Sequence, residues 1–350
     1  MKNKILITGG SGFIGTNFVK LLYKNYPNTE IFNLDKFDFE ISKNNHRDIL
    51  AQKFLTNIKQ NSKHKLSPDN RYHEINGSIL DEELLDKLFR EYKFDQVINF
   101  AAQSHVDNSI KSPNIFTINN VIGTQNLLNQ CLKNETSLFI QISTDEVYGS
   151  LKAEDTSTNE ESTLQPNNPY SASKAAADCI VRSYYQTYQL PCIITRSSNN
   201  FGPYQYPEKL IPVVISNALK NQTIPIYGDG LNIRDWVFVE DNCKAIDFIR
   251  QNGKIGEVYN IPGHSEITNI QMSTEILKIL NKATSLIKYV EDRKGHDFRY
   301  SMDGRKLKKL GFEIQSNFSK NLKDTVNWYL NNPNWLSTKE TSTRVNVRSK

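Results

Sequence analysis

The chain has 350 residues, of which 38% are hydrophobic and 23% are charged, an ordinary globular composition. Its 43 basic and 38 acidic side chains leave a net charge of +5 without a basic run interleaved with aromatics, which argues against nucleic acid as a partner. With neither a signal-peptide core nor an 18-residue apolar span, the sequence predicts a cytoplasmic protein that does not bind membranes.

Short apolar runs alternate with helical stretches through the first 200 residues. They predict strands at 5–7, 31–34, 97–100, 138–142 and 192–194. Strands separated by helices of about 10–15 residues are typical of βαβ units and of a parallel sheet covered on both faces. We therefore expect an α/β fold with a doubly wound parallel sheet, forming a Rossmann domain over residues 1–198.

The first predicted strand runs into a glycine-rich segment with Gly9, Gly12 and Gly15, and a helix follows. Glycines at this spacing allow a tight turn and a close approach of the backbone to a pyrophosphate at the helix N-terminus. Asp35 ends the next strand, where a carboxylate would accept both hydroxyls of an adenosine ribose. Its charge would repel a 2′-phosphate, so NAD is favoured over NADP.

Two later regions are less regular. Residues 36–70 are rich in Lys, Asn and Ser and predict a solvated surface insertion with one helix near 48–58, although a functional role is open. Beyond Asn199 the chain is punctuated by Pro and Gly, which predicts a smaller, irregular C-terminal substrate-binding lobe over 199–336, with some segments returning to the Rossmann domain. Residues 337–350 are expected to be a disordered tail.

A tyrosine and a lysine lie four residues apart at Tyr170 and Lys174, so a helix would present both on one face. A phenol whose pKa is ordinarily about 10 needs a nearby positive charge to act as a base near neutrality, and an ammonium together with a nicotinamide ring would supply it. Upstream, at the end of the 138–142 strand, Thr144, Asp145 and Glu146 occupy the position where α/β sheets carry their chemistry. The four cysteines lack metal-ligand spacing, and we expect no metal.

With these motifs the chain resembles the extended short-chain dehydrogenase/reductase family, and within it the dTDP-glucose and UDP-glucose 4,6-dehydratases. The resemblance runs from Lys4 to about Trp335. It rests on the segments already described and on 101–107, 169–174, 198–204, 207–212, 234–236 and 292–297.

The resemblance implies a cycle on a nucleotide-activated hexose. Tyr170 would remove the proton of the C4 hydroxyl while hydride passes to NAD, and Glu146 would take the C5 proton while Asp145 protonates the departing C6 hydroxyl. Hydride would then return to C6 as C5 is reprotonated. Thr144 would hydrogen-bond the C4 oxygen and Lys174 would hold the nicotinamide ribose. Two such carboxyls need pKa values pushed apart, with Asp145 protonated and Glu146 ionised.

The resemblance also implies ligand contacts. The cofactor would be contacted by Gly9, Gly12, Phe13, Ile14, Gly15, Asp35, Ser78, Ile79, Ala101, Ala102, Ser104, Tyr170, Lys174 and Asn200. The nucleotide and diphosphate would face Asn199, Lys209, Leu210, Pro225, Ile226, Tyr227, Arg234, Asn269, Arg293 and His296, with His105 either a substrate contact or a core histidine.

Three departures from the family pattern bear on the substrate. Ser78 replaces an aspartate expected near the adenine, Asn108 replaces an arginine of the thymidylyl enzymes, and Lys294 replaces a proline. They favour a UDP-sugar weakly over a dTDP-sugar. UDP-glucose, UDP-N-acetylglucosamine and dTDP-glucose stay open as substrates, as does an added 5-epimerisation.

Two rival functions and an oligomeric state complete the expectations. A UDP-hexose 4-epimerase shares the glycine motif and the Tyr/Lys pair but does not need Asp145 and Glu146, and a catalytically silent NAD-binding scaffold predicts erosion of residues that are intact here. A homodimer is expected through the helices after Asn119 and Tyr170, although an ordinary core face explains the same apolar pattern: Val121, Leu127, Leu128, Ala175, Ala176, Ile180 and Tyr184.

Overall fold

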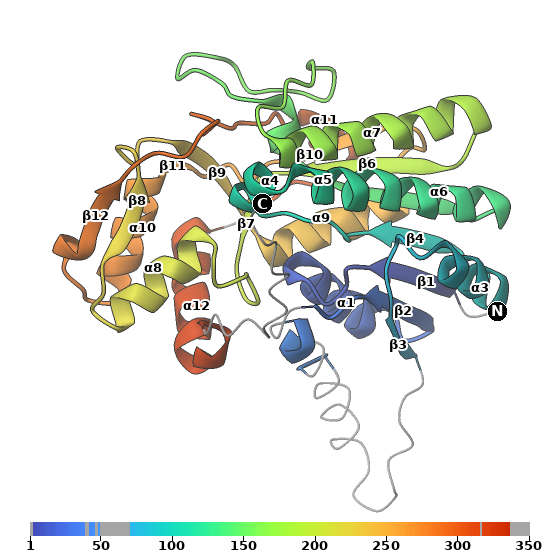
Figure 1. Ribbon diagram of the computed structural model, residues 1–350, viewed down its shortest axis with the longest axis horizontal. Helices are drawn as coiled ribbons and strands as arrows, with labels where there is room; N and C mark the ends of the chain where they lie inside the picture. Colours follow the sequence, from blue (N-terminus) through green and yellow to red (C-terminus); the bar gives the residue numbers. More distant parts are fainter. Residues whose placement is uncertain (1–2, 39–41, 46–47, 50–70, 316, 337–350) are drawn as a thin grey trace, which may run out of the picture.

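A computed structural model describes residues 3–38, 42–45, 48–49, 71–315 and 317–336, and its centre is a seven-stranded sheet (Figure 1). The strand order is β10-β6-β5-β4-β1-β2-β3, and every pair in it is parallel. The strands are β1 (Asn3–Thr8), β2 (Thr29–Asp35), β3 (Tyr72–Asn76), β4 (Gln96–Asn99), β5 (Leu138–Thr144), β6 (Cys192–Ser197) and β10 (Val258–Ile261). The order reverses between β1 and β4, and a crevice at the carboxyl ends of strands at such a point is where open α/β sheets bind ligands.

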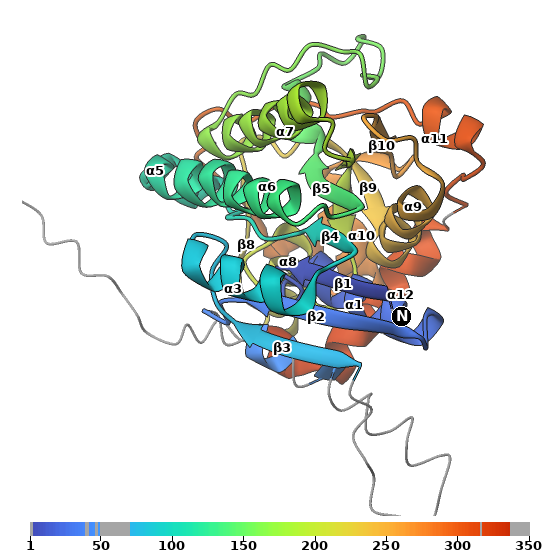
Figure 2. The ribbon, with the colours of Figure 1, turned by 90° about the vertical axis from the view of Figure 1, so that its right-hand side faces the viewer.

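Helices cover both faces of this sheet, as Figure 2 shows. One face packs against α3 (Glu82–Tyr92), α6 (Gly123–Lys133) and α7 (Pro169–Tyr188), and the other against α1 (Phe13–Asn25) and α9 (Val239–Asn252). Between β4 and α6 the chain forms α4 (Val106–Lys111), α5 (Pro113–Phe116) and the π-helical turn η1 (Thr117–Ile122). The 3-10 turn η2 (Asp145–Tyr148) follows β5, and α11 (Arg305–Leu310) lies near β10.

The second half of the chain builds a smaller lobe beside the carboxyl ends of the strands (Figure 1). It contains a three-stranded sheet, β11-β9-β7, and a parallel pair, β12-β8. Its elements are β7 (Asn199–Phe201), α8 (Leu210–Leu219), β8 (Ile224–Tyr227), β9 (Ile233–Phe238), β11 (Glu266–Thr268), α10 (Asn269–Ile279), η3 (Thr284–Leu286), β12 (Ile287–Val290), α12 (Phe318–Asn331) and η4 (Pro333–Leu336). A separate apolar core holds the lobe together around Phe201, Ile215, Trp236, Ile276 and Tyr329.

The expected fold class is confirmed, and all five predicted strands are present: four have wider bounds, and β4 is shifted by one residue toward the N-terminus. β10 and α9 come from the second half of the chain but belong to the large sheet and its helical layer, so the two parts exchange segments. No helix in the described residues is long and apolar enough to cross a membrane.

Part of the 36–70 segment differs from the expectation of a solvated insertion. Residues 42–45 and 48–49 are helical, and the side chains of Ser42, Asn45 and Ile49 are buried. They pack because Asn45 bonds the glycine-rich loop and Trp335, while Ile49 joins the core on the α1 face. The rest of the predicted 48–58 helix and the predicted tail at 337–350 lie outside the described residues.

Candidate active site

The glycine-rich loop joins β1 to α1 and lies against the end of β4. Gly9 has a left-handed φ of +69°, and a Cβ there would lie 2.7 Å from the Ala101 nitrogen. A Cβ on Gly15 would lie 2.3 Å from the Gly9 carbonyl oxygen, so side chains at either position would displace the loop. Gly12 is the N-cap of α1 without a side-chain cap, which leaves the first N–H groups of the helix available to an anion.

Asp35 ends β2 beside this loop. Its carboxylate accepts hydrogen bonds from the main-chain nitrogens of Ser11, at 3.0 Å, and Phe37, at 3.1 Å. Burial raises the pKa of the Asp35 carboxyl, and these two hydrogen bonds oppose that effect. The loop, the open helix N-terminus and the carboxylate one strand away together fit the pyrophosphate and adenosine ribose of a dinucleotide.

The other predicted cofactor residues lie along the same edge of the sheet but differ in what their side chains can offer. Phe13 and Ile14 open α1, while Ala101, Ala102 and Ser104 follow β4. Ile79 is buried in the core on the α6 face, which leaves only its main chain for a ligand, and the Ser78 hydroxyl accepts a hydrogen bond from the Leu80 nitrogen and keeps its proton to donate. The Asn200 amide is likewise bonded to Ser197, Ser198 and Asn242.

The five predicted catalytic residues gather where β5 and α7 meet. Thr144 ends β5, and its hydroxyl donates to Oδ1 of Asp145 at 3.1 Å. Glu146 follows in η2, and its Oε2 lies 3.5 Å from Nδ2 of Asn168. Tyr170 and Lys174 lie one turn apart on α7, and the Lys174 ammonium donates to the Ile142 carbonyl at 2.5 Å.

The two adjacent carboxyls differ in their electrostatic surroundings. The pKa of Asp145 is raised well above its ordinary range, first by burial and then by the charges of Glu146 and Asp235. Burial also raises the pKa of Glu146, but the positive charges of Arg293, Arg234 and Lys209 oppose it. Asp145 is therefore the member of the pair that holds a proton first, as an acid and a base side by side require.

The pKa shifts of Tyr170 and Lys174 differ from the expectation that a nearby ammonium lowers the pKa of the phenol. Burial and the charge of Glu146 raise the pKa of the Tyr170 phenol, while a hydrogen bond with Thr144 opposes the rise. Burial lowers the pKa of Lys174 to about 8, with the Asp178 carboxylate acting in the opposite direction. The protein's own groups thus do not lower the phenol's pKa as expected; a positively charged nicotinamide ring, when NAD is bound, would act in that direction.

Three predicted substrate cations surround the catalytic carboxyls. Their positive charges lower the pKa of Glu146. Lys209 lies at the start of α8, Arg234 on β9 and Arg293 in the loop after β12. Arg293 has a buried Nε with no hydrogen-bond partner among the described residues, and its Nη1 lies 4.0 Å from Asp107. Arg234 is held by main-chain carbonyls of residues 233, 297 and 298, so it offers its charge more than its hydrogen bonds. Such a cluster suits a diphosphate.

The other predicted substrate residues come from the start of α4 and from the smaller lobe. His105 caps α4 and its Nε2 lies 3.7 Å from Glu208, while Lys209 donates to the Ser104 carbonyl across the boundary. His296 lies against the Tyr227 ring and 2.6 Å from the Asp292 carboxylate. Oδ1 of Asn199 is buried without a hydrogen-bond partner among the described residues. Leu210, Pro225 and Asn269 lie at the starts of α8, β8 and α10, and the Ile226 side chain lies in the lobe core, which leaves only its main chain for a ligand.

Several site residues were not anticipated from the sequence. Asn168 caps α7 and reaches Glu146, and the Asn-Pro pair before Tyr170 is a helix-start signal that could have revealed it. Asn120 bonds Ser173 and both main-chain groups of Gln103, which ties η1 to α7. Asp107 accepts from the Tyr227 hydroxyl at 3.4 Å, and no local pattern marks it.

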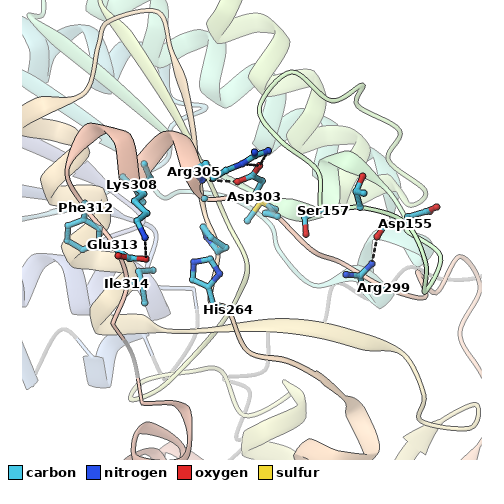
Figure 3. A pocket seen from close by; sticks show the side chains of 15 residues that line it. Asp155, Ser157, His264, Arg299, Asp303, Arg305, Lys308, Phe312, Glu313 and Ile314 are labelled. Carbon is cyan, nitrogen blue, oxygen red and sulfur yellow. Dashed lines mark hydrogen bonds and ion pairs between the residues drawn. The ribbon is translucent and has the colours of Figure 1, made fainter.

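A cavity of about 660 Å³ lies elsewhere, between the 155–157 loop and α11 (Figure 3). Its wall carries Arg305 paired with Asp303, Lys308 paired with Glu313, and Arg299 bonded to the Asp155 carbonyl and to Glu266. None of the five catalytic residues lines it. The catalytic cluster is therefore a separate site.

Comparison with known proteins places the chain among sugar-nucleotide enzymes. The family model described as GDP-mannose 4,6 dehydratase matches residues 6–325. The low-salt glycan biosynthesis protein Agl12 of Haloferax volcanii is 44% identical over 93% of this chain and 98% of its own. A dTDP-glucose 4,6-dehydratase of Salmonella typhimurium is 41% identical over 95% of this chain and 94% of its own. The dTDP-glucose 4,6-dehydratase of Streptomyces venezuelae, solved with NAD bound, has a TM-score of 0.85 at 41% identity, covering 95% of this chain and 98% of its own.

Proposed function

We propose that this chain, which belongs to the nucleotide-sugar 4,6-dehydratases of the extended short-chain dehydrogenase/reductase family, converts dTDP-glucose to its 4-keto-6-deoxy product with NAD as cofactor. The observation that carries the proposal is the pair Asp145 and Glu146 beside Tyr170 and Lys174. An epimerase needs only the second pair, whereas elimination of water across C5 and C6 needs both an acid and a base.

Each catalytic residue has a task that its surroundings support. NAD, when bound, supplies the acceptor that takes a hydride from C4 and later returns it to C6. Tyr170 accepts the proton of the C4 hydroxyl, and the 4-ketone then acidifies the neighbouring C5–H. Glu146 removes the C5 proton while Asp145 donates a proton to the C6 hydroxyl, which leaves as water. The proton on Glu146 returns to C5 at the end, and the cycle is reset when Tyr170 releases to solvent the proton that it took and Asp145 takes one up.

The surrounding residues hold these groups in place. The Thr144 hydroxyl, which bonds the Asp145 carboxyl, is positioned to bond the C4 oxygen as well. Asn168 holds Glu146 from the N-terminus of α7, and Lys174 is fixed by the Ile142 carbonyl with its ammonium available to the nicotinamide ribose. Lys209, Arg234 and Arg293 supply the positive charge that a diphosphate requires.

The choice of dTDP-glucose reverses the weak preference for a UDP-sugar. Relatives that are 38–41% identical over 95% of this chain carry the thymidylyl name. Of the three departures, Ser78 lies on the cofactor side next to β3, and Lys294 is exposed. Lys294 follows Arg293 and Asn108 lies on α4, both near the substrate residues, but two exposed side chains are a weak basis for choosing a base.

We also propose a homodimer. Leu127, Leu128, Ala175 and Tyr184 lie in the core of one subunit, so they are not the interface residues. Ile115, Ile118 and Ile122 instead project into solvent along α5 and η1. With the exposed Ala172 and Ala176 on α7, they form an apolar stripe that a second copy would cover.

The test is to incubate purified protein and NAD with dTDP-glucose, UDP-glucose and UDP-N-acetylglucosamine separately. Mass spectrometry follows the loss of one water, and NMR reads the configuration at C5. We expect dehydration of dTDP-glucose with C5 configuration retained, and no product with Glu146→Gln.

Other results would revise the proposal in defined ways. Preferential dehydration of a UDP-sugar would restore the preference drawn from the departures, and an inverted C5 would add a 5-epimerisation. A new hexose epimer without a change in mass would replace the dehydratase with the 4-epimerase.

A further inference from the structure

Arg196 is a buried cation that the proposed cycle does not use. It lies on β6 with 5% of its surface exposed. Its Nε donates to Oδ2 of Asp178 at 2.9 Å, and its Nη1 donates to the Tyr148 hydroxyl at 2.8 Å. One guanidinium therefore connects α7, which carries Asp178, to η2, which carries Tyr148.

These two elements carry the two catalytic pairs. α7 presents Tyr170 and Lys174, and Asp178 follows one turn after Lys174 on the same face of the helix. η2 presents the acid and the base, and Tyr148 ends it. In a 3-10 turn the side chains of residues i and i+3 lie above one another, so Asp145 and Tyr148 share a face. Both contacts of the guanidinium are thus made to elements that hold reacting groups.

The strand register brings the members of this network together. Ser143 on β5, Arg196 on β6 and Asn260 on β10 are register partners, so their side chains lie side by side on one face of the sheet. The Ser143 hydroxyl donates to Oδ2 of Asp178 at 3.0 Å, and the Tyr148 hydroxyl donates to Oδ1 of Asn260 at 2.8 Å. Each of these five side chains is 6% exposed or less.

The hydrogen bonds of Tyr148 have a fixed direction. A guanidinium cannot accept, so the Tyr148 hydroxyl accepts from Arg196 and must donate to Asn260. The Asn260 amide is fixed in turn, with its oxygen toward Tyr148 and its nitrogen 3.3 Å from the Thr158 carbonyl. The end of η2 is therefore held against β6 and β10 by donors and acceptors that cannot exchange roles.

Stability alone does not explain a charged pair in this place. A buried ion pair costs desolvation free energy that its attraction only partly returns, and apolar residues of similar volume often stabilise a core as well or better. The same face of the sheet already has an apolar core around Phe139, Val181 and Ile194. A planar group that donates in two directions can fix two partners relative to each other, which an apolar side chain cannot do.

We propose that Arg196 is a positioning residue that sets the distance between the acid and base on η2 and the Tyr170 and Lys174 pair on α7. The inference rests on the dehydratase cycle of the proposed function, in which Tyr170 serves the oxidation at C4 and the acid and base serve the loss of water. A shift of η2 relative to α7 leaves the oxidation intact and slows the elimination, because a misplacement of about 1 Å can cost about 100-fold in rate.

Tyr148→Phe tests this by breaking the link to η2. The variant keeps the aromatic ring, whose centroid lies 4.9 Å from the central carbon of the guanidinium. In a single turnover with the nucleotide sugar that the wild-type protein dehydrates, the absorbance of NADH follows both hydride transfers. NADH should form at the wild-type rate, and its return to NAD should slow by about 10-fold or more, because water must leave before hydride reaches C6.

Tyr259→Phe is the matched control. Tyr259 is also buried, at 3% exposure, but it lies on the opposite face of β10, and its hydroxyl accepts from the Lys254 nitrogen at 2.9 Å. The variant therefore loses one buried hydroxyl without touching η2. Both hydride transfers should keep their wild-type rates.

Arg196→Lys tests the guanidinium itself. A lysine keeps the positive charge, but one ammonium cannot reproduce the planar fork. We expect the same slow return of NADH to NAD as in Tyr148→Phe. Wild-type rates in either variant, or equal slowing of both hydride transfers in Tyr148→Phe, would overturn the inference.

A measurement without substrate separates this inference from the proposed function. Main-chain hydrogen exchange, followed by mass spectrometry, should rise about 5-fold in residues 145–149 of Tyr148→Phe, the effect of one lost hydrogen bond, and stay unchanged in residues 170–178. If exchange in 145–149 is unaltered, Arg196 does not hold η2 and the inference is wrong. If it rises but no nucleotide sugar loses water with the wild-type protein, the proposed function fails and the placement of η2 by Arg196 stands.

Discussion

Lys174 combines a catalytic task with an energetic cost. Its ammonium is buried, donates to the Ile142 carbonyl, and has a pKa lowered to about 8. The unfolded chain keeps this proton up to about pH 10.5, so between pH 8 and 10.5 the unfolded state binds more protons and the free energy of unfolding rises with pH. Below pH 8 the cost of the buried charge is fully present.

Lys174→Met should therefore separate stability from activity. We expect the free energy of unfolding at pH 7 to rise by roughly 1–3 kcal/mol, and the gain to shrink between pH 8 and 10.5. Activity should fall by about 100-fold or more. Urea unfolding at several pH values and the water-loss assay measure both quantities, with the exposed Lys254→Met as the control. A variant less stable than wild type at every pH would contradict the expectation.

At the scale of single residues, the reacting side chains could be predicted from the sequence, but the side chains that hold them in position could not. Local spacing in the sequence identifies the four reacting residues, and the structure brings them together: Tyr170, Lys174, Asp145 and Glu146. Asn120 is not marked in this way, because its partners Gln103 and Ser173 come from other parts of the chain.

At the scale of elements, the glycine-rich loop depends on a helical segment that comes 30 residues later. The Asn45 side chain is fully buried, donates to the Ser11 carbonyl at 3.0 Å and accepts from the Trp335 indole at 2.6 Å. It thereby connects the loop between β1 and α1 to η4 at the far end of the described chain. Asn45 is thus placed to keep the loop in the conformation that holds the pyrophosphate.

Asn45→Ala should loosen this loop. Loss of both bonds leaves the buried Ser11 carbonyl and the partly buried Trp335 indole N–H without these partners, which costs about 2 kcal/mol. We expect NAD to dissociate about 10-fold faster, since each 1.4 kcal/mol is a factor of ten. Displacement of bound NAD followed by fluorescence measures the rate, and Lys43→Ala, an exposed neighbour, should leave it unchanged. An unaltered rate in Asn45→Ala would show that the segment is only a surface support.

The elements themselves were largely predictable, for a physical reason. Strands buried on both faces read as short apolar runs, so β1, β2, β4, β5 and β6 are visible in the sequence. Residues 42–45 and 48–49 have the composition of a solvated segment because most of their contacts are polar: Asn45 bonds the loop and Asp48 meets Lys20 and Tyr204, while Ile49 enters the apolar core. A polar segment that packs through hydrogen bonds has the composition of a solvated one.

At the scale of the whole molecule, the apolar stripe lies directly behind the catalytic tyrosine. Ile118 in η1 is 48% exposed, while Phe116 and Asn120, two residues to either side, are buried. The Phe116 ring meets the Tyr170 ring edge-on with centroids 6.4 Å apart, and Asn120 bonds Ser173. A second copy covering the stripe would therefore press α5 and η1 against α7 and fix the position of the Tyr170 hydroxyl.

Ile118→Asp should dissociate the dimer and lower activity together. A charge placed in a covered apolar face is strongly unfavourable because it must be desolvated. We expect light scattering to show a dimer for the wild-type protein and a monomer for the variant, and kcat to fall by about 10-fold because Tyr170 loses support through Phe116 and Asn120. Leu330→Asp on α12, where the leucine is 44% exposed, should change neither. A wild-type protein that is monomeric at assay concentrations and fully active would refute the dimer, and a monomeric variant with unchanged kcat would show that the interface and the catalytic tyrosine are independent.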